Sequence, residues 1–170
     1  MTTNDPATTV DPRFSMEGAP PVPWPDARQA LEEAGTYWLS TVRSDGRPHV
    51  TTLIGLWNGD ALYFSSGPAE QKCKNLETNP HCVLTTGTNR LDEGLDVVVE
   101  GEAVRVTDET RLRVLAEAWD TKYGRDWQLT GSEADPDLVF EVLPVTAFGF
   151  RKGFGEGGQG SQTRWHWDRS

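Results

Sequence analysis

Two dipeptides, Asp45-Gly46 and Asn58-Gly59, limit the possible folds of this sequence more than any other feature. Both stand between runs of β-branched and aromatic residues, and both supply the positive φ angle that a tight hairpin turn requires. They predict strands over 36–42, 49–57 and 61–66 that follow one another as an antiparallel meander. A parallel sheet would need much longer connections between these strands.

Further strand patterns lie later in the chain. We predict strands at 82–86, 96–106, 138–143, 146–151 and 163–167, the third and fourth being separated by Pro144. The valines at 97–99 occupy both faces of their strand, which indicates burial on both sides, as in a barrel wall or a subunit contact. Gly101 predicts a bulge or bend in the same strand.

Two helices are expected on either side of this region. One covers about 26–34, with Asp26 as its N-cap and Gly35 at its end. The clearer one covers 109–123 and ends at Gly124, and its apolar residues recur at helical spacing. We interpret that apolar stripe as a lid on the sheet rather than a groove for a partner. With a third short helix, these elements predict a mainly β fold with flanking helices, a small antiparallel β-barrel of six or seven strands.

The length of 170 residues suits one domain with a sizeable core. The first 24 residues are rich in Thr, Pro and Asp, and only Phe14, Met16 and Trp24 are large apolar groups that would pin them. The organisation that we expect is a flexible N-terminal tail over 1–24, a barrel domain over 25–151, and a Gly-rich loop with a C-terminal strand over 152–170 that completes the domain.

The composition excludes several classes of protein. A formal net charge of −10 argues against a general nucleic-acid binder, which needs a basic face for phosphates. The sequence has no apolar run of about 18 residues and no secretory signal, so we expect no membrane contact. Cys73 and Cys82 lack zinc spacing, and no histidine completes a metal site, so we expect reduced structural thiols in the cytoplasm.

The third helix carries a candidate phosphate site. It opens at Gly67-Pro68 and stops at Asn79-Pro80, with Ala69, Cys73 and Leu76 on its apolar stripe and Lys72 and Lys74 off it. The hydroxyls of Ser65 and Ser66, the free N–H groups of a helix start and Lys72 one turn later are suited to hold a phosphate. An ordinary helix start with solvated lysines explains the same residues.

Motifs for other chemistry fail or are absent. Residues 155–160 match Gly-x-Gly-x-x-Gly, but a strand pattern follows where dinucleotide binding needs a helix, so we expect a hairpin loop. The sequence contains no Gly-x-Ser-x-Gly, Walker or His-Glu-x-x-His motif, and no paired carboxylates stand out. A chain so poor in catalytic side chains suits a protein whose cofactor supplies the chemistry, or a plain ligand-binding barrel.

Several segments occur in one order that resembles a known family. They are residues 36–42, 45–50, 62–66, 72–80 and 98–103. The arrangement resembles the pyridoxamine-phosphate-oxidase-like, flavin-binding split-barrel family, and most of all its actinobacterial branch that uses the deazaflavin coenzyme F420. The resemblance implies a six-stranded antiparallel split β-barrel, a homodimer, and two cofactor sites at the subunit interface, with FMN as the alternative cofactor.

The resemblance also implies which residues bind the cofactor. Thr51, Thr52 and Leu53 match the strand along the flavin ring, Ser65, Ser66 and Gly67 match the strand end at the ribityl chain and phosphate, and Lys72 and Lys74 match basic positions at the phosphate. Glu70 and Gln71 stand where relatives often carry Arg or Ser. Glu70 would compete with a bound phosphate for the positive end of the helix.

Three functions follow as hypotheses. The first is an oxidoreductase that uses F420 to transfer hydride to a small conjugated or heterocyclic molecule, with Trp57, Trp165 and His166 as candidates for the substrate side. The second is an FMN-dependent flavoprotein that passes electrons to oxygen or another acceptor. The third is a non-catalytic flavin, haem or tetrapyrrole binder, in which His49 or His166 would be the haem ligand.

Overall fold

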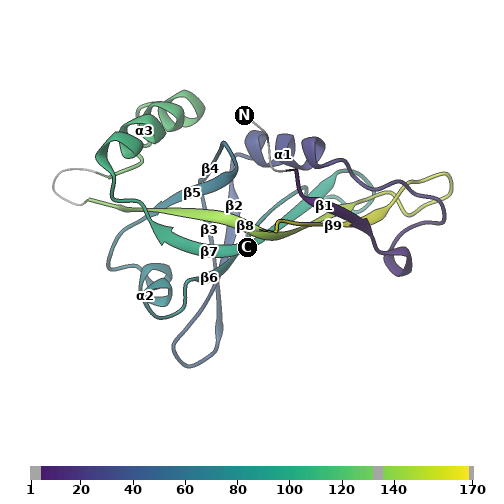
Figure 1. Cartoon of the computed structure of the whole chain (residues 1–170), viewed down its shortest axis with the longest axis horizontal. Coiled ribbons are helices and arrows are strands. Elements are labelled where there is room, and N and C mark those ends of the chain that lie inside the picture. Colours follow the sequence, from purple (N-terminus) through teal and green to yellow (C-terminus); the bar gives the residue numbers. More distant parts are fainter. Residues whose placement is uncertain (1–4, 132–135, 169–170) are drawn as a thin grey trace. The chain divides into compact units, whose positions relative to one another are not determined.

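A computed structural model describes residues 5–131 and 136–168 (Figure 1). The helices are the short η1 (Pro12–Phe14), α1 (Trp24–Glu33), α2 (Gln71–Thr78) and α3 (Glu109–Tyr123). The strands are β1 (Ala7–Val10), β2 (Tyr37–Val42), β3 (Pro48–Leu53), β4 (Leu56–Asn58), β5 (Ala61–Ser66), β6 (His81–Thr86), β7 (Leu95–Arg105), β8 (Leu138–Arg151) and β9 (Ser161–His166). The mainly β fold with flanking helices is thereby confirmed.

The strands pair in the order β1-β9-β8-β7-β6-β2-β3, and β4 and β5 join this path through the pairing of β5 with β8. The hydrogen-bonded path therefore has ends at β1 and β3. The chain divides into two compact units. Unit 1 comprises Met1–Ala34, Leu84–Glu100 and Pro144–Ser170, and unit 2 comprises Gly35–Val83 and Gly101–Leu143.

Both predicted hairpin turns are confirmed in unit 2. Gly46 has a φ of 84° in the turn that joins β2 to β3, and Gly59 has a φ of 63° in the turn that joins β4 to β5. The β2–β3 ladder pairs Tyr37 with Leu53 at one end and Val42 with Pro48 at the other. Glycine tolerates these φ angles without a steric penalty, which is why the two dipeptides predict the turns.

The predicted single strand over 49–57 is wrong, because the chain breaks at Ile54-Gly55 between β3 and β4. The backbone of Gly55 bonds to side chains of α3 instead of a neighbouring strand: its N–H donates to the Tyr123 hydroxyl at 3.1 Å. A Cβ at Gly55 would lie 3.0 Å from Cδ2 of Tyr37, so a larger residue would crowd that ring. The break separates the β2–β3 hairpin from the β4–β5 hairpin, so the two do not form one simple meander.

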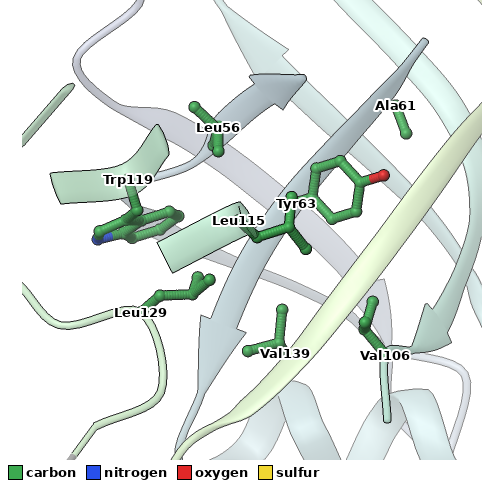
Figure 2. Close-up of a cluster of buried hydrophobic side chains, with 8 residues drawn as sticks. All are labelled: Leu56, Ala61, Tyr63, Val106, Leu115, Trp119, Leu129 and Val139. Carbon is green, nitrogen blue, oxygen red and sulfur yellow. The ribbon is translucent and has the colours of Figure 1, made fainter. Parts of the chain in front are cut away.

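Helix α3 covers the core of unit 2, as its spacing predicts (Figure 2). Leu115 and Trp119 are 3% and 1% exposed and pack with apolar residues of the strands. The whole cluster consists of Leu56, Ala61, Tyr63, Val106, Leu115, Trp119, Leu129 and Val139. Asp108 caps the helix by accepting the Arg111 N–H at 2.7 Å, and Gly124 ends it with a φ of 82°.

Helix α2 begins at Gln71, so the predicted start at Gly67-Pro68 is wrong. Pro68, Ala69 and Glu70 form a turn before the helix, and Ala69 is exposed. Buried Cys73 and Leu76 confirm most of the predicted stripe, and Asn75 joins them because its amide donates to the Thr41 hydroxyl at 2.9 Å. A buried amide with a partner costs little, which an apolar pattern does not reveal.

Unit 1 contains the N-terminal segment and the last strands. Strand β1 pairs with β9 from Ala7↔His166 to Val10↔Thr163, so part of the segment predicted as a tail is hydrogen-bonded to the domain. Its side chains are mostly exposed, which explains why composition does not indicate a strand. Of the residues expected to pin the segment, Trp24 is 8% exposed whereas Phe14 is 58% exposed.

Helix α1 begins at Trp24, and Asp26 is not its cap. Pro23 stands at the N-cap without a side-chain hydrogen bond, and Asp26 lies in the first turn. The Trp24 ring packs edge-on against Trp165 and Trp167, with centroid distances of 5.4 and 4.8 Å. These contacts place the helix start two residues before the polar residue that sequence rules favour.

Strand β8 is continuous through Pro144, which contradicts the predicted break. Its pairing with β5 ends at Val142↔Leu62 and its pairing with β9 begins at Thr146↔His166. Pro144 lies between these ladders, where neither needs its missing N–H. Gly101 lies inside continuous β7 and allows close approach, since a Cβ there would be 2.4 Å from the Leu143 carbonyl oxygen.

Several smaller expectations are also resolved. Residues 152–160 connect β8 to β9 and are followed by a strand, so the hairpin interpretation of the Gly-rich segment is confirmed. Cys73 and Cys82 are buried and free. None of the helices in the described part of the chain has the length and apolar character that a membrane crossing requires.

Candidate functional site

A cleft of about 440 Å³ opens in unit 2 where β3 and β5 end. It is lined by residues of the β2 approach, the β3 end, β5, α3 and the loop after α3: Thr36, Thr52, Leu53, Ile54, Ser65, Trp119, Asp126, Trp127, Gln128 and Asp137. A volume of this size lies within the range of small-molecule and cofactor sites. The cleft combines apolar walls with a few hydroxyls, amides and carboxylates.

Three of the predicted site residues, Thr52, Leu53 and Ser65, line this cleft together. Thr51 is opposite Leu39 in the β2–β3 ladder, and Thr52 is opposite Trp38. Successive side chains of a strand point to opposite faces, so Thr51 shares the face of buried Leu39 while Thr52 shares the face of exposed Trp38. Of the two threonines, only Thr52 lines the cleft.

The loop after α3 supplies cleft residues that sequence reasoning missed. Trp127 is 60% exposed although it is large and apolar, and it lines the cleft beside Gln128. Two residues later Leu129 is 2% exposed within the unit 2 core, so the loop is fixed to the domain next to this ring. The isolated Trp127-Gln128-Leu129 in a polar loop was the available indication, because such loops rarely carry large apolar residues without a function.

The predicted phosphate residues lie beside the cleft in a small charged cluster. Lys72 forms an ion pair with Glu70, and its side chain is only 12% exposed. The same carboxylate of Glu70 accepts a hydrogen bond from the Ser66 hydroxyl at 3.2 Å. Ser66 is buried, and neighbouring Ser65 lines the cleft. Glu70 therefore links Ser66 to Lys72, whereas Ser65, the preceding residue of β5, lines the cleft.

Two acidic side chains of this cluster lie close to Gly67. A Cβ built at Gly67 would lie 3.6 Å from Oδ1 of Asp137 and 3.6 Å from Cγ of Glu70. Burial lowers the pKa of Lys72, while Cys73 and Asp137 act in the opposite direction. The cation that was predicted to hold a phosphate is thus already influenced by two acidic side chains of its own chain.

The other predicted residues lie elsewhere. Lys74 is exposed on α2. Trp57 is 5% exposed in unit 2, and Trp165 is fully buried in unit 1, so both are core residues rather than cleft residues. His166 is exposed on β9 of unit 1, with Nδ1 3.3 Å from the Thr146 hydroxyl. None of these four residues lines the cleft of unit 2.

His49 lies on β3 in a polar network near α2. Its Nδ1 is 3.4 Å from the Thr41 hydroxyl, which accepts the Asn75 amide. Burial, followed by the positive charges of Arg43 and Lys72, lowers the pKa of His49. No group of three or more His, Cys, Asp or Glu side chains suited to a metal occurs among residues 5–131 and 136–168.

Comparisons with known proteins relate this chain to one family. The family model described as pyridoxamine 5'-phosphate oxidase matches residues 24–151. A curated pyridoxine/pyridoxamine 5'-phosphate oxidase of Christiangramia forsetii is 28% identical over 85 residues, which are 49% of this chain. That match spans 39% of the curated relative's length.

Solved structures agree on the fold. An F420 reductase is 26% identical with a TM-score of 0.54, over 71% of this chain and 94% of that one. A FAD-binding protein of Mesorhizobium loti is 19% identical with a TM-score of 0.60, over 85% of this chain and 95% of that one. At 19% identity, the likeness to the FAD-binding protein concerns the fold alone.

Proposed function

Because this chain belongs to the pyridoxamine 5'-phosphate oxidase family, we propose that it is a flavin- or deazaflavin-dependent oxidoreductase with F420 as its cofactor. The observation that carries the proposal is the cleft of unit 2, which contains Thr52, Leu53 and Ser65 and adjoins Lys72. These are positions that the family resemblance matches to the ring and the phosphate of the cofactor. The likeness to a solved F420 reductase supports the choice of F420, and FMN is the second candidate.

The cleft suits the ring part of such a cofactor. Leu53 and Ile54 offer an apolar edge, and exposed Trp127 offers a flat aromatic surface of a kind that stacks on conjugated rings. Thr52 adds a hydroxyl that donates or accepts. A planar heterocycle with polar edges needs this mixture of apolar walls and a few hydrogen-bonding groups.

The charged cluster contains donors for the phosphate part of such a cofactor, and Glu70 already binds two of them. Ser65, Ser66 and Lys72 are the donors that would hold a phosphate. Glu70 occupies two of these donors and lies on an exposed turn, so binding requires its carboxylate to move from Lys72. The donors for a phosphate are present, and Glu70 partly neutralises the positive charge of Lys72.

In this mechanism, the bound reduced cofactor supplies hydride to a conjugated or heterocyclic small molecule. The residues at the end of β3 would hold the ring, Thr52 would orient it through its hydroxyl, and Trp127 and the core residue Trp119 would limit the access of water. We assign no acid to a side chain, since solvent protonates the product equally well. The substrate is therefore selected by shape and apolar contact in the cleft.

We also propose a homodimer that completes the site. The outer face of the β2–β3 hairpin exposes Trp38, Val42 and Val50 by 41%, 36% and 58%. These residues share that face with Thr52, which lines the cleft. A second copy covering this apolar face would bury it and add a wall beside the cleft. The two buried free thiols support a reducing cytoplasmic location.

Tryptophan fluorescence tests the cofactor. We expect F420 to quench the emission of the cofactor-free protein and to bind more tightly than FMN, and Trp127→Phe to reduce the quenching amplitude. Tighter binding of FMN would favour the second candidate, and a failure of both to bind would refute the proposal. A Soret band on adding haem, lost when His49 is replaced, would instead support the non-catalytic haem binder.

Two charge variants test the phosphate cluster. Lys72→Ala should weaken F420 binding more than tenfold, because Glu70 and Asp137 would then remain without their cation. Arg47→Ala removes the same charge from an exposed turn and is the matched control, expected within twofold of wild type. Equal affinities of the two variants would exclude Lys72 from the site.

A further inference from the structure

We infer that Glu70 and Asp137 determine which phosphate this site accepts: they disfavour a dianionic phosphomonoester and tolerate a monoanionic phosphodiester. The inference rests on the proposed function, since it concerns the terminal group of the same cofactor. It assigns a specificity role to two carboxylates of this chain. It predicts that FMN and F420 are distinguished at their phosphates as well as at their rings.

Glu70 is placed to compete with a phosphate for the donors of this cluster. It stands at the N-cap of α2, a position where Ser, Thr, Asp or Asn usually accepts a backbone N–H of the first turn, and it makes no such side-chain cap. Its carboxylate contacts Lys72 and the Ser66 hydroxyl instead. Both donors that would bind a phosphate oxygen are thus held by an acceptor of the chain itself.

Asp137 adds a second negative charge from another direction. It precedes β8, its amide N–H donates to the Thr130 carbonyl at 2.9 Å, and its Oδ1 faces Gly67 from the side of the cleft. It also acts on the titration of Lys72. The two carboxylates therefore both lie close to Gly67, at the strand end that meets the phosphate in the proposed site.

The charges in the cluster decide which ligand is tolerated. Lys72 contributes one positive charge, whereas Glu70 and Asp137 contribute two negative ones. A phosphomonoester such as that of FMN carries about −1.5 to −2 at neutral pH. The phosphodiester of F420 carries a single negative charge, so it meets about half of the repulsion.

Pairs of ligands that share a ring test the inference without measuring activity. Riboflavin and FMN differ only in the phosphomonoester, and the deazaflavin nucleoside and F420 differ in the phosphodiester tail. Dissociation constants come from tryptophan quenching at one fixed ionic strength. For wild type we expect FMN to bind no more than about threefold more tightly than riboflavin.

Glu70→Gln removes one charge with almost no change in shape. We expect it to tighten FMN about tenfold and F420 about threefold, and to leave riboflavin and the deazaflavin nucleoside within twofold, because these lack the phosphate. Asp137→Asn should act in the same direction and serves as an independent second variant. Glu77→Gln, on the exposed last turn of α2, makes the same charge change and should alter none of the four affinities.

The outcomes separate the inference from the proposed function. If wild type prefers FMN to riboflavin by more than tenfold, or if neither variant changes that ratio, the carboxylates do not select the phosphate, although the ring site stands. If no ligand binds to wild type or to either variant, both the inference and the proposed function are refuted. If wild type binds only the ligands without a monoester and Glu70→Gln gains FMN, the inference is supported.

Discussion

The hydroxyl of Tyr123 holds the break between β3 and β4, so Tyr123→Phe should loosen the edge of the cleft. The hydroxyl accepts the Gly55 N–H at 3.1 Å and donates to the Gly55 carbonyl at 2.6 Å, with the Gly35 carbonyl 3.2 Å away. Lys122 also donates to the Gly55 carbonyl, at 3.0 Å. Phenylalanine keeps the ring contact with Trp119, whose centroid is 5.1 Å away.

The size of the expected loss in unfolding free energy depends on which groups lose their hydrogen-bond partners. In the variant, the Gly55 carbonyl keeps Lys122, but the buried Gly55 N–H loses its acceptor. An unsatisfied buried backbone donor costs about 1–3 kcal/mol. Burial raises the pKa of Tyr123, so its hydroxyl keeps its proton at neutral pH. The stabilisation from this hydroxyl is present below about pH 10, which is the pKa of tyrosine in the unfolded chain. It is lost only as the pH rises through the higher pKa of Tyr123 in the folded protein.

Urea unfolding at neutral pH measures this cost. We expect Tyr123→Phe to lower the free energy of unfolding by about 1–3 kcal/mol with an unchanged m-value, and to weaken binding in the cleft because Leu53 and Ile54 adjoin the break. Thr121→Ala removes an exposed hydroxyl of the same helix and should stay within about 0.5 kcal/mol of wild type. A loss below about 0.5 kcal/mol for Tyr123→Phe would show that water replaces the hydroxyl and that the reasoning fails.

Three further predictions concern stability. Leu115→Ala should lower the free energy of unfolding in urea by about 2–5 kcal/mol because Leu115 is 3% exposed, whereas Val114→Ala, at a 56% exposed position of the same helix, should lower it by under about 1 kcal/mol. Similar losses in the two variants would contradict the packing of α3. Gly101→Ala should lower the unfolding free energy by about 1–3 kcal/mol through its clash with the Leu143 carbonyl, and Gly155→Ala, in open space, should be near neutral. Burial raises the pKa of Cys82 to about 12, so the unfolding free energy should fall by about 2 kcal/mol between pH 9 and 10.5. Cys82→Ala should lessen this fall, and an equal pH dependence in the variant and wild type would show that the thiol is not its cause.

Local chemistry accounts for the parts of the fold that the sequence predicts well. Gly46 and Gly59 need only their neighbours in the chain to form turns, and the stripe of α3 is a property of one helix. The break at Gly55 depends on Tyr123, and the start of α1 depends on packing of Trp24 against Trp165. Such contacts join distant segments, and no window of sequence contains both partners.

The candidate site was predictable to a similar extent. Thr52 and Ser65 both line the cleft of unit 2, and their role in cofactor binding stays a prediction. Trp127 and Asp137 reach the same cleft from a long loop, whose path no periodicity describes. The sequence predicts that Glu70 competes with a phosphate from the first turn of a helix opening at Gly67-Pro68. The structure instead places Glu70 at the N-cap of α2, in contact with Lys72 and Ser66.

The continuity of β8 through Pro144 restricts how this chain tolerates changes of length. Residues before the proline pair with β5, and residues after it pair with β9. The register of both pairings is therefore set within one continuous strand. An insertion or deletion of one residue between Val142 and Thr146 would turn either Val142 or Ala147, both fully buried, out of its core. Homologous chains are therefore expected to vary in length in the 87–94 loop and in the Gly-rich hairpin, and to keep this short segment at constant length.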